Sequence, residues 1–149
     1  MSALITAWQA ALAGEHQAAF GYSLLGPRLT GRALALAIAC SNAHEALRDR
    51  TEQALVAAGQ SPVQSRADYP ALYPVRTADA ARALAIRLED DCAAGWRHLY
   101  AVAAGMAADA QVTVVRHDAQ SALTASAVRA TRWRLVSGEA RATVAFPGV

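Results

Sequence analysis

Lysine is absent from the 149-residue sequence, so all 14 of its strongly basic side chains are arginine. The 12 acidic residues are interspersed with the arginines along most of the chain, and the formal net charge is only +2. Binding of nucleic acid through charge would require a basic stripe. The one local excess lies near the C-terminal end, where cations complement the negative end of a helix: Arg129, Arg132, Arg134 and Arg141. We therefore predict no nucleic-acid partner.

Cysteine is also scarce, and its two residues, Cys40 and Cys92, both lie in alanine-rich segments. No CxxC motif occurs, and so sparse a pair forms neither a disulfide framework nor a zinc knuckle. We expect both to be small buried side chains, although a bridge stays open if their helices are neighbours. The sequence also lacks a nucleophile elbow, a phosphate-binding loop and a dinucleotide fingerprint, which argues against the enzymes that use them.

The N-terminal segment lacks the basic residues and the uninterrupted apolar stretch of a signal peptide or a membrane span. Gln9 and residues 15–17 interrupt its apolar positions. We therefore expect no membrane partner and a cytoplasmic location.

Alanine is what the sequence has in quantity: it supplies much of the 54% hydrophobic content, whereas aromatic residues make up 6%. Alanine is the best helix former and β-branched residues are sparse, so this composition favours helices over strands. The length is that of one domain with a core of its own. We predict a single all-α domain over residues 1–149, with a C-terminal tail from about residue 138.

Capping residues, glycines and prolines mark four helical segments. Their expected bounds are Ser2 to Leu25, Thr30 or Gly31 to Gly59, Ala78 to about Ala108, and about Ala110 to Val136. Ser2 and Thr77 are the expected N-caps of the first and third helices. Only Gly105 and Asp109 signal a break between the last two.

Residues 60–76 separate the second and third predicted helices and contain Pro62, Pro70 and Pro74. These prolines exclude a helix, and no alternating pattern indicates a strand. The other connections are short, so helices one and two, and helices three and four, should form antiparallel hairpins. One long central connection is typical of ferritin-like topology. The sequence therefore predicts an all-α, ferritin-like four-helix bundle with one long crossover between helices 2 and 3.

Polar side chains interrupt the apolar face of every predicted helix near its middle. The set comprises Glu15, His44, Arg48, Glu89, Asp118 and Arg129. A buried unpaired charge costs several kcal/mol, so these groups must be paired, solvated or bound to something. One interpretation is a metal pair, held in helix bundles by a Glu from each of two helices and a Glu-x-x-His from each of the others. The other is a buried ion-pair network, in which arginines neutralise the carboxylates.

The spacing of these residues favours the ion-pair network. Glu45-x-x-Arg48 stands where a metal site has Glu-x-x-His, and a guanidinium cannot be a ligand. The fourth predicted helix contains no glutamate at all. We therefore predict no catalytic residue, no metal and no cofactor. In the alternative, iron or manganese would be held by Glu15, His44 and Glu89.

Five short segments, spread over nearly the whole chain, carry a resemblance through their order and spacing. They are LAGEHQAAFGY at Leu12–Tyr22, AHEALRD at Ala43–Asp49, YPALYPV at Tyr69–Val75, LEDDCA at Leu88–Ala93 and FPG at Phe146–Gly148. Together they resemble a ferritin-like domain family of unknown function. The resemblance implies a ferritin-like bundle without an assigned activity. It also implies that Glu15 and Glu89 stand at the positions of the first-helix and third-helix metal glutamates of ferritins.

Three hypotheses about function follow. The favoured one is a non-enzymatic binding or scaffolding module, forming a homodimer, that has lost its di-metal site. The alternative is a metal-dependent oxidase or oxygenase that uses the two glutamates and the histidine named above. The third is a small-molecule pocket lined by Trp8, Tyr22 and Trp96, for which an alanine-rich core leaves little room.

Overall fold

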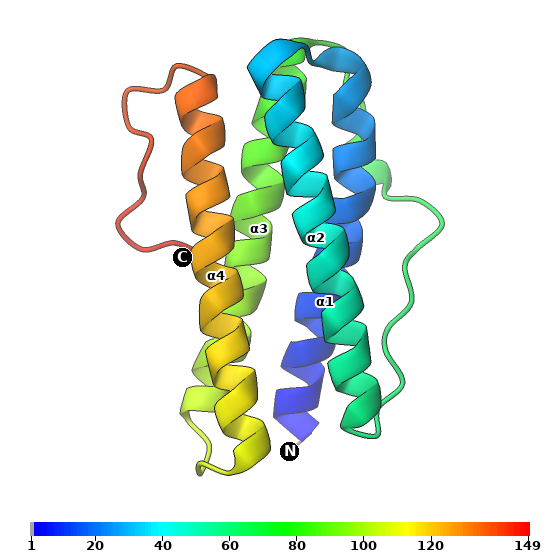
Figure 1. The fold of residues 1–149 in the computed structure, drawn as a ribbon, viewed down its shortest axis with the longest axis vertical. Coiled ribbons are helices and arrows are strands. Elements are labelled where there is room, and N and C mark those ends of the chain that lie inside the picture. The colour runs from blue at the N-terminus through cyan, green and yellow to red at the C-terminus, as the bar shows by residue number, and fades with distance from the viewer. Residues whose placement is uncertain (1) are drawn as a thin grey trace.

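The computed structural model describes residues 2–149, which form four long helices and no strand. The helices are α1 (Ser2–Leu25), α2 (Gly31–Ala57), α3 (Ala78–Ala104) and α4 (Ala110–Val136), with short 3-10 turns at Gly26–Arg28 and Pro70–Leu72. They pack side by side as a bundle (Figure 1). The predicted all-α four-helix fold is confirmed.

The connections set the direction of each helix. Short turns make α1 and α2, and likewise α3 and α4, antiparallel neighbours. The crossover between α2 and α3 runs back along the whole length of the bundle, so these two helices point the same way (Figure 1). Helix α3 packs most extensively, against α4 and α1, whereas α2 and α4 make few contacts. Helix α2 therefore depends on α1 and on the bundle centre for its position.

The caps of α3 and α4 explain where these helices begin. The Thr77 side chain accepts a hydrogen bond from the Ala80 backbone N–H (3.1 Å), as predicted. The Asp109 carboxylate accepts one from the Val112 N–H (2.7 Å) in the same way. Each cap satisfies a donor that the first helical turn leaves without a partner.

One predicted cap and two predicted helix ends differ from the structure, and α2 ends at Ala57 rather than at Gly59. Ser2 is the first helical residue of α1 rather than its N-cap, and Met1 lies outside the described residues. Helix α3 ends at Ala104 instead of about Ala108, because Gly105 caps it and the chain then leads directly into the Asp109 cap of α4.

The core consists of two apolar clusters stacked along the bundle axis. One contains Leu12, Leu99 and Trp96, and the other contains Leu25 and Trp133. The apolar positions that flank Glu15 on α1 and Glu89 on α3 are buried, among them Ala11, Ala18, Ala85 and Ala93. Glu15, His44 and Glu89 are buried as well and lie between these two apolar clusters.

Side chains of α1 form hydrogen bonds with backbone groups of the crossover and hold it beside the bundle. The Gln9 amide donates to the Ser61 carbonyl (2.8 Å) and accepts from the Val63 N–H (2.7 Å). His16 Nε2 lies 2.9 Å from the Val63 carbonyl oxygen, and its side chain is buried. These contacts explain why a proline-rich segment without regular structure holds a fixed path beside the bundle.

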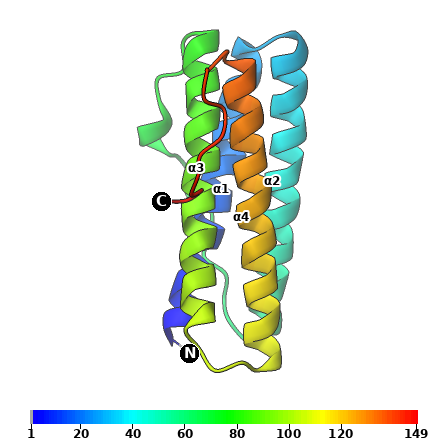
Figure 2. The ribbon, with the colours of Figure 1, turned by 90° about the vertical axis from the view of Figure 1, so that its left-hand side faces the viewer.

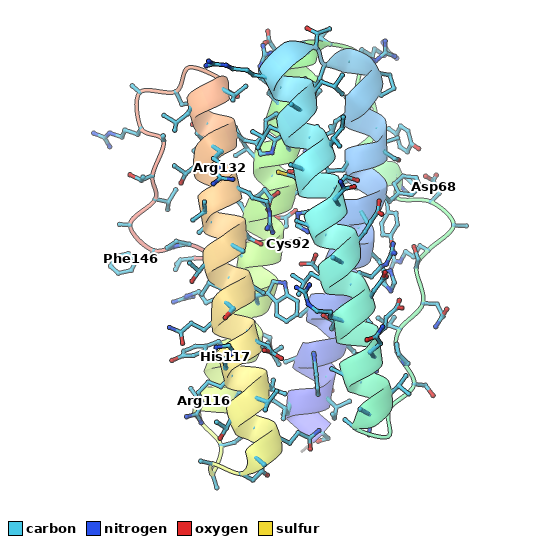
Figure 3. The ribbon with its side chains drawn as sticks, viewed as in Figure 1. Asp68, Cys92, Arg116, His117, Arg132 and Phe146 are labelled. Atoms are coloured by element: carbon cyan, nitrogen blue, oxygen red, sulfur yellow. The ribbon has the colours of Figure 1, made fainter. Side chains whose placement is uncertain are left out.

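Two further predictions concern the cysteines and the membrane. Both cysteines are buried and neither forms a disulfide, consistent with their role as small core side chains. Cys92 lies near the middle of the bundle (Figure 3), with its Sγ 3.7 Å from the Gly14 carbonyl. Within residues 2–149, none of the helices has an apolar stretch that could cross a membrane.

Candidate functional site

The centre of the bundle holds an imidazole between two carboxylates. Glu15 from α1, His44 from α2 and Glu89 from α3 are all inaccessible to solvent. His44 Nδ1 lies 2.6 Å from Glu15 Oε2, and His44 Nε2 lies 3.0 Å from Glu89 Oε1. An ionised carboxylate can only accept, so with both glutamates ionised both ring nitrogens donate and His44 is an imidazolium. Burial lowers its pKa, but the hydrogen bonds and charges of the two carboxylates outweigh burial and raise the pKa to about 9.

A fourth helix supplies the second positive charge. Arg129 Nε donates to Glu89 Oε2 (2.9 Å), and its Nη2 donates to Ser126 Oγ (3.1 Å). Burial raises the pKa of Glu89, but the His44 hydrogen bond and the charges of His44 and Arg129 lower it overall. Two carboxylates, one imidazolium and one guanidinium leave the cluster with no net charge. One charged group from each helix thus joins all four helices.

Aromatic donors complete the hydrogen bonding of the carboxylates. Trp96 Nε1 donates to Glu15 Oε1 (2.7 Å), and the Tyr22 hydroxyl donates to Glu89 Oε1 (2.6 Å). Trp133 Nε1 in turn donates to the Tyr22 oxygen (2.8 Å). Burial and the Glu89 charge raise the pKa of Tyr22 well above its ordinary value, so this donor keeps its proton. Each of the four carboxylate oxygens accepts at least one hydrogen bond.

The sequence analysis named Tyr22 and Trp96 only as the lining of a small-molecule pocket and did not identify any of these three aromatic residues as hydrogen-bond donors to the carboxylates. A signal was available in the spacing. Tyr22 follows Glu15 by seven residues and Trp96 follows Glu89 by seven, so each aromatic ring shares a helix face with a carboxylate two turns away. A buried indole N–H or phenol O–H needs a partner, and the carboxylates are the nearest acceptors.

Two residues of the predicted cluster lie elsewhere, and that part of the prediction is wrong. The Arg48 side chain is 30% exposed and pairs with its neighbour Asp49 (2.8 Å). Asp118 is 57% exposed, beside His117. Asp118 precedes the buried Ala119, and successive residues of a helix are rotated by about 100°. Arg48 keeps its charge in water by extending its long side chain past the apolar face.

Cys92 completes a set of three groups that could ligate a metal ion. One ligand atom each from Glu15, His44 and Cys92 lie within 4.8 Å of one another, and all three residues are buried. A metal would require a neutral imidazole and a thiolate. The structure favours the protonated forms: His44 donates through both nitrogens, and burial with the charges of Glu15 and Glu89 raises the pKa of the Cys92 thiol. In this arrangement the donor set fits protons better than a metal.

No buried polar side-chain atom of the cluster is left without a partner. Among the described residues, the only buried side-chain nitrogen or oxygen lacking a hydrogen bond is Arg116 Nε. Arg116 lies near the start of α4, well below Cys92 in the view of Figure 3. The chain itself therefore gives every buried polar atom of the charged groups at least one hydrogen-bond partner.

Replacing Arg129 with methionine is expected to destabilise the fold by about 2 kcal/mol, because Glu89 would lose a charged hydrogen bond while staying buried. The same replacement at Arg48 removes only an exposed pair and should change the free energy of unfolding by less than about 0.5 kcal/mol. Urea unfolding at neutral pH measures both. Equal losses from the two variants would show that Arg129 has no special part in the cluster.

The comparisons with known proteins agree with this fold. A crystal structure of a conserved hypothetical protein from Mycobacterium tuberculosis is 33% identical in sequence, with a TM-score of 0.81. The match covers 91% of this chain and 97% of that one. No curated protein matches the chain. A family described as "Domain of unknown function (DUF4439)" matches residues 7–149, and the chain belongs to this family.

Proposed function

We propose that the protein is a non-catalytic binding or scaffolding module with a ferritin-like bundle, in which an ion-pair network occupies the place of a di-metal site. The long crossover supports the ferritin-like assignment, because it makes α2 and α3 parallel. The position of Glu15 and Glu89 on α1 and α3 supports it as well. The observation that carries the proposal is His44, whose ring contacts both carboxylates at once.

Electrostatics explains why such a network substitutes for metal ions. In a metal site the cation neutralises the carboxylates and connects the helices that bear them. Here the imidazolium of His44 and the guanidinium of Arg129 do both. Helix α2 makes few contacts with α4, so His44 is its polar connection to the rest of the core. We infer that the network fixes the register of the four helices, the role for which buried ion pairs are best supported.

Metal analysis of the purified protein tests the proposal. Protein produced in medium with iron, manganese and zinc should carry far less than one equivalent of any of them. A chelator should leave the thermal unfolding curve unchanged, whereas removing a tightly bound metal at a thousandfold its dissociation constant would cost about 4 kcal/mol. Stoichiometric iron or manganese that survives gel filtration would refute the metal-free network.

His44 contacts both Glu15 and Glu89, and this convergence favours one other function, a metal-dependent oxidase or oxygenase holding iron or manganese. His44 would have to lose a proton to become a ligand. Under this alternative, Fe²⁺ or Mn²⁺ binds anaerobically with one equivalent, and Glu15→Ala abolishes that binding. Metal binding that persists in Glu15→Ala would exclude this site.

The proposed scaffold is a homodimer. Exposed apolar side chains occur at the end of α4 and along the tail: Leu135, Val136, Val144 and Phe146. Exposed apolar groups of this kind mark interaction surfaces when they are contiguous. Sedimentation equilibrium should give twice the chain mass, and a monomer at micromolar concentration would exclude the dimer. The single domain over residues 1–149 and the cytoplasmic location stay predictions.

A further inference from the structure

The C-terminal tail, residues 138–149, forms a strap fixed at both ends. At its start, Gly138 adopts a φ of +76° and the Glu139 N–H bonds to the Arg134 carbonyl (3.0 Å), which closes α4. At its end, Gly148 has a φ of +79° and lies so close to α3 that an added Cβ would be 2.7 Å from the Ala93 carbonyl oxygen. Figure 2 shows the strap descending along α4 and ending beside α3.

Between Gly138 and Gly148 the strap does not pack tightly against the helices. No hydrogen bond joins residues 140–147 to the rest of the described chain. A cavity of about 740 Å³ separates this part of the strap from α3 and α4. Phe146, the one aromatic residue of the strap, is 73% exposed and points away from the helices (Figure 3), so it does not fill the space.

The cavity has the size and lining of a small-molecule site. Its wall on α4 extends from Leu123 to Arg134, about 17 Å along the helix. None of the residues that line it is aromatic, and its apolar walls are aliphatic: Ala94, Leu123, Ala127, Val128, Val144, Pro147 and Val149. A long aliphatic cavity without aromatic rings fits an extended alkyl chain better than a flat ring system.

The charged residues that line the cavity indicate which polar group a bound alkyl chain would carry. Arg134 is already neutralised, because it pairs with Asp90 (2.5 Å) and lies 3.8 Å from Glu139. Arg132, exposed on α4 (Figure 3), forms neither an ion pair nor a side-chain hydrogen bond with the described residues. A guanidinium without a partner binds a carboxylate through two parallel hydrogen bonds. Asp91 adds one carboxylate to the wall, which disfavours a second negative charge on the ligand.

We propose that the cavity under the C-terminal strap binds a medium-chain alkyl monocarboxylate, with the chain along α4 and the carboxylate on Arg132. The proposal names a ligand for the binding module proposed above. It also gives the Phe146–Gly148 motif a role: Gly148 anchors the strap that covers the ligand, while residues 140–147 are free to open.

Calorimetric titration of the full chain with dodecanoate, below its micellar concentration, tests the proposal. One equivalent should bind, while acetate, which has the head group alone, and dodecyltrimethylammonium, which has the chain with a positive head, should bind at least tenfold more weakly. Arg132→Ala should weaken dodecanoate binding by about ten- to a hundredfold. Arg32→Ala removes an exposed arginine of α2 and changes the net charge equally, so it should leave the affinity unchanged.

Two further variants test the cavity itself. Ala127→Phe should fill the cavity and abolish dodecanoate binding. Gly148→Ala should release the end of the strap from α3 and weaken dodecanoate binding. Both variants should keep the helical circular dichroism of the wild type. Equal dodecanoate binding by wild type, Arg132→Ala and Ala127→Phe would show adsorption to the surface and overturn the proposal. Absence of binding, including the case of a dimer that covers this face, would overturn it too. Because the metal analysis does not involve the cavity, failure here leaves the metal-free network standing.

Discussion

Replacing His44 with alanine is expected to lower the free energy of unfolding by about 3–5 kcal/mol. The substitution removes the cation that contacts both Glu15 and Glu89. It leaves the two carboxylates buried beside the space that the imidazole filled. For a chain of this length, that loss corresponds to a fall in melting temperature on the order of 10 °C. Urea unfolding at pH 7, followed by far-ultraviolet circular dichroism, measures it.

The matched control is His117→Ala, the same chemical change at a side chain that is 79% exposed. It should alter the free energy of unfolding by less than about 0.5 kcal/mol. Adding Glu15→Gln to His44→Ala should restore part of the lost stability, because it removes the carboxylate charge that is left without a cation, whereas Glu89 keeps its pair with Arg129. If His44→Ala proved as mild as His117→Ala, the carboxylates would have to be neutral or hydrated, and the ion-pair network would be wrong.

The helices were predictable because local signals agree with the tertiary structure. The bounds of α1 and α4 match the prediction, since Gly26-Pro27 ends one and Asp109 caps the other. The position of the crossover was predictable because three prolines exclude a helix between α2 and α3. The end of α3 was missed because a glycine in an alanine-rich run ends a helix only when the next element begins nearby.

The polar cluster was predictable only in part. Glu15 interrupts a face of α1 that is buried throughout, and His44 lies on the face of α2 that carries the buried Cys40 and Leu55, so their convergence follows from the helical period. Arg48 and Asp118 show where this reasoning fails, because a rotation of one residue, or a long flexible stem, returns a charge to water. The spacing of seven residues indicates that Trp96 shares a helix face with Glu89, but it does not identify Glu15 as the acceptor: that hydrogen bond joins α3 to α1, and the distance between two helices is not encoded in the pattern of either one.

The cluster connects sequence, fold and the proposed function through one physical requirement. Four buried charges are tolerable in an apolar core only when they sum to zero and when every buried polar atom has a partner. The chain meets both conditions with its own side chains. A metal ion bound by His44 would have to break a hydrogen bond between the imidazole and a carboxylate, because both ring nitrogens are engaged.

The second large effect is a loss of stability with rising pH. The pKa of His44 is raised from 6.5 in the unfolded chain to about 9 in the folded one. Its contribution is therefore complete below pH 6.5, declines between pH 6.5 and 9, and is lost above pH 9. The shift corresponds to roughly 3 kcal/mol. Glu89 acts in the opposite direction: its pKa is lowered, so its contribution is present above about pH 4.5 and is lost as the pH falls through the folded value.

Urea unfolding of wild type and His44→Ala across pH 6 to 10 isolates the histidine, because every other titrating group is common to both proteins. The two proteins should differ most at pH 6, and the gap should narrow by roughly 3 kcal/mol by pH 10, as wild type loses the imidazolium that the variant never had. The direction is diagnostic, since a neutral histidine acting only as packing would give a gap independent of pH. A stability difference that does not change with pH would therefore show that His44 is a neutral imidazole, and not an imidazolium, between the two carboxylates at neutral pH.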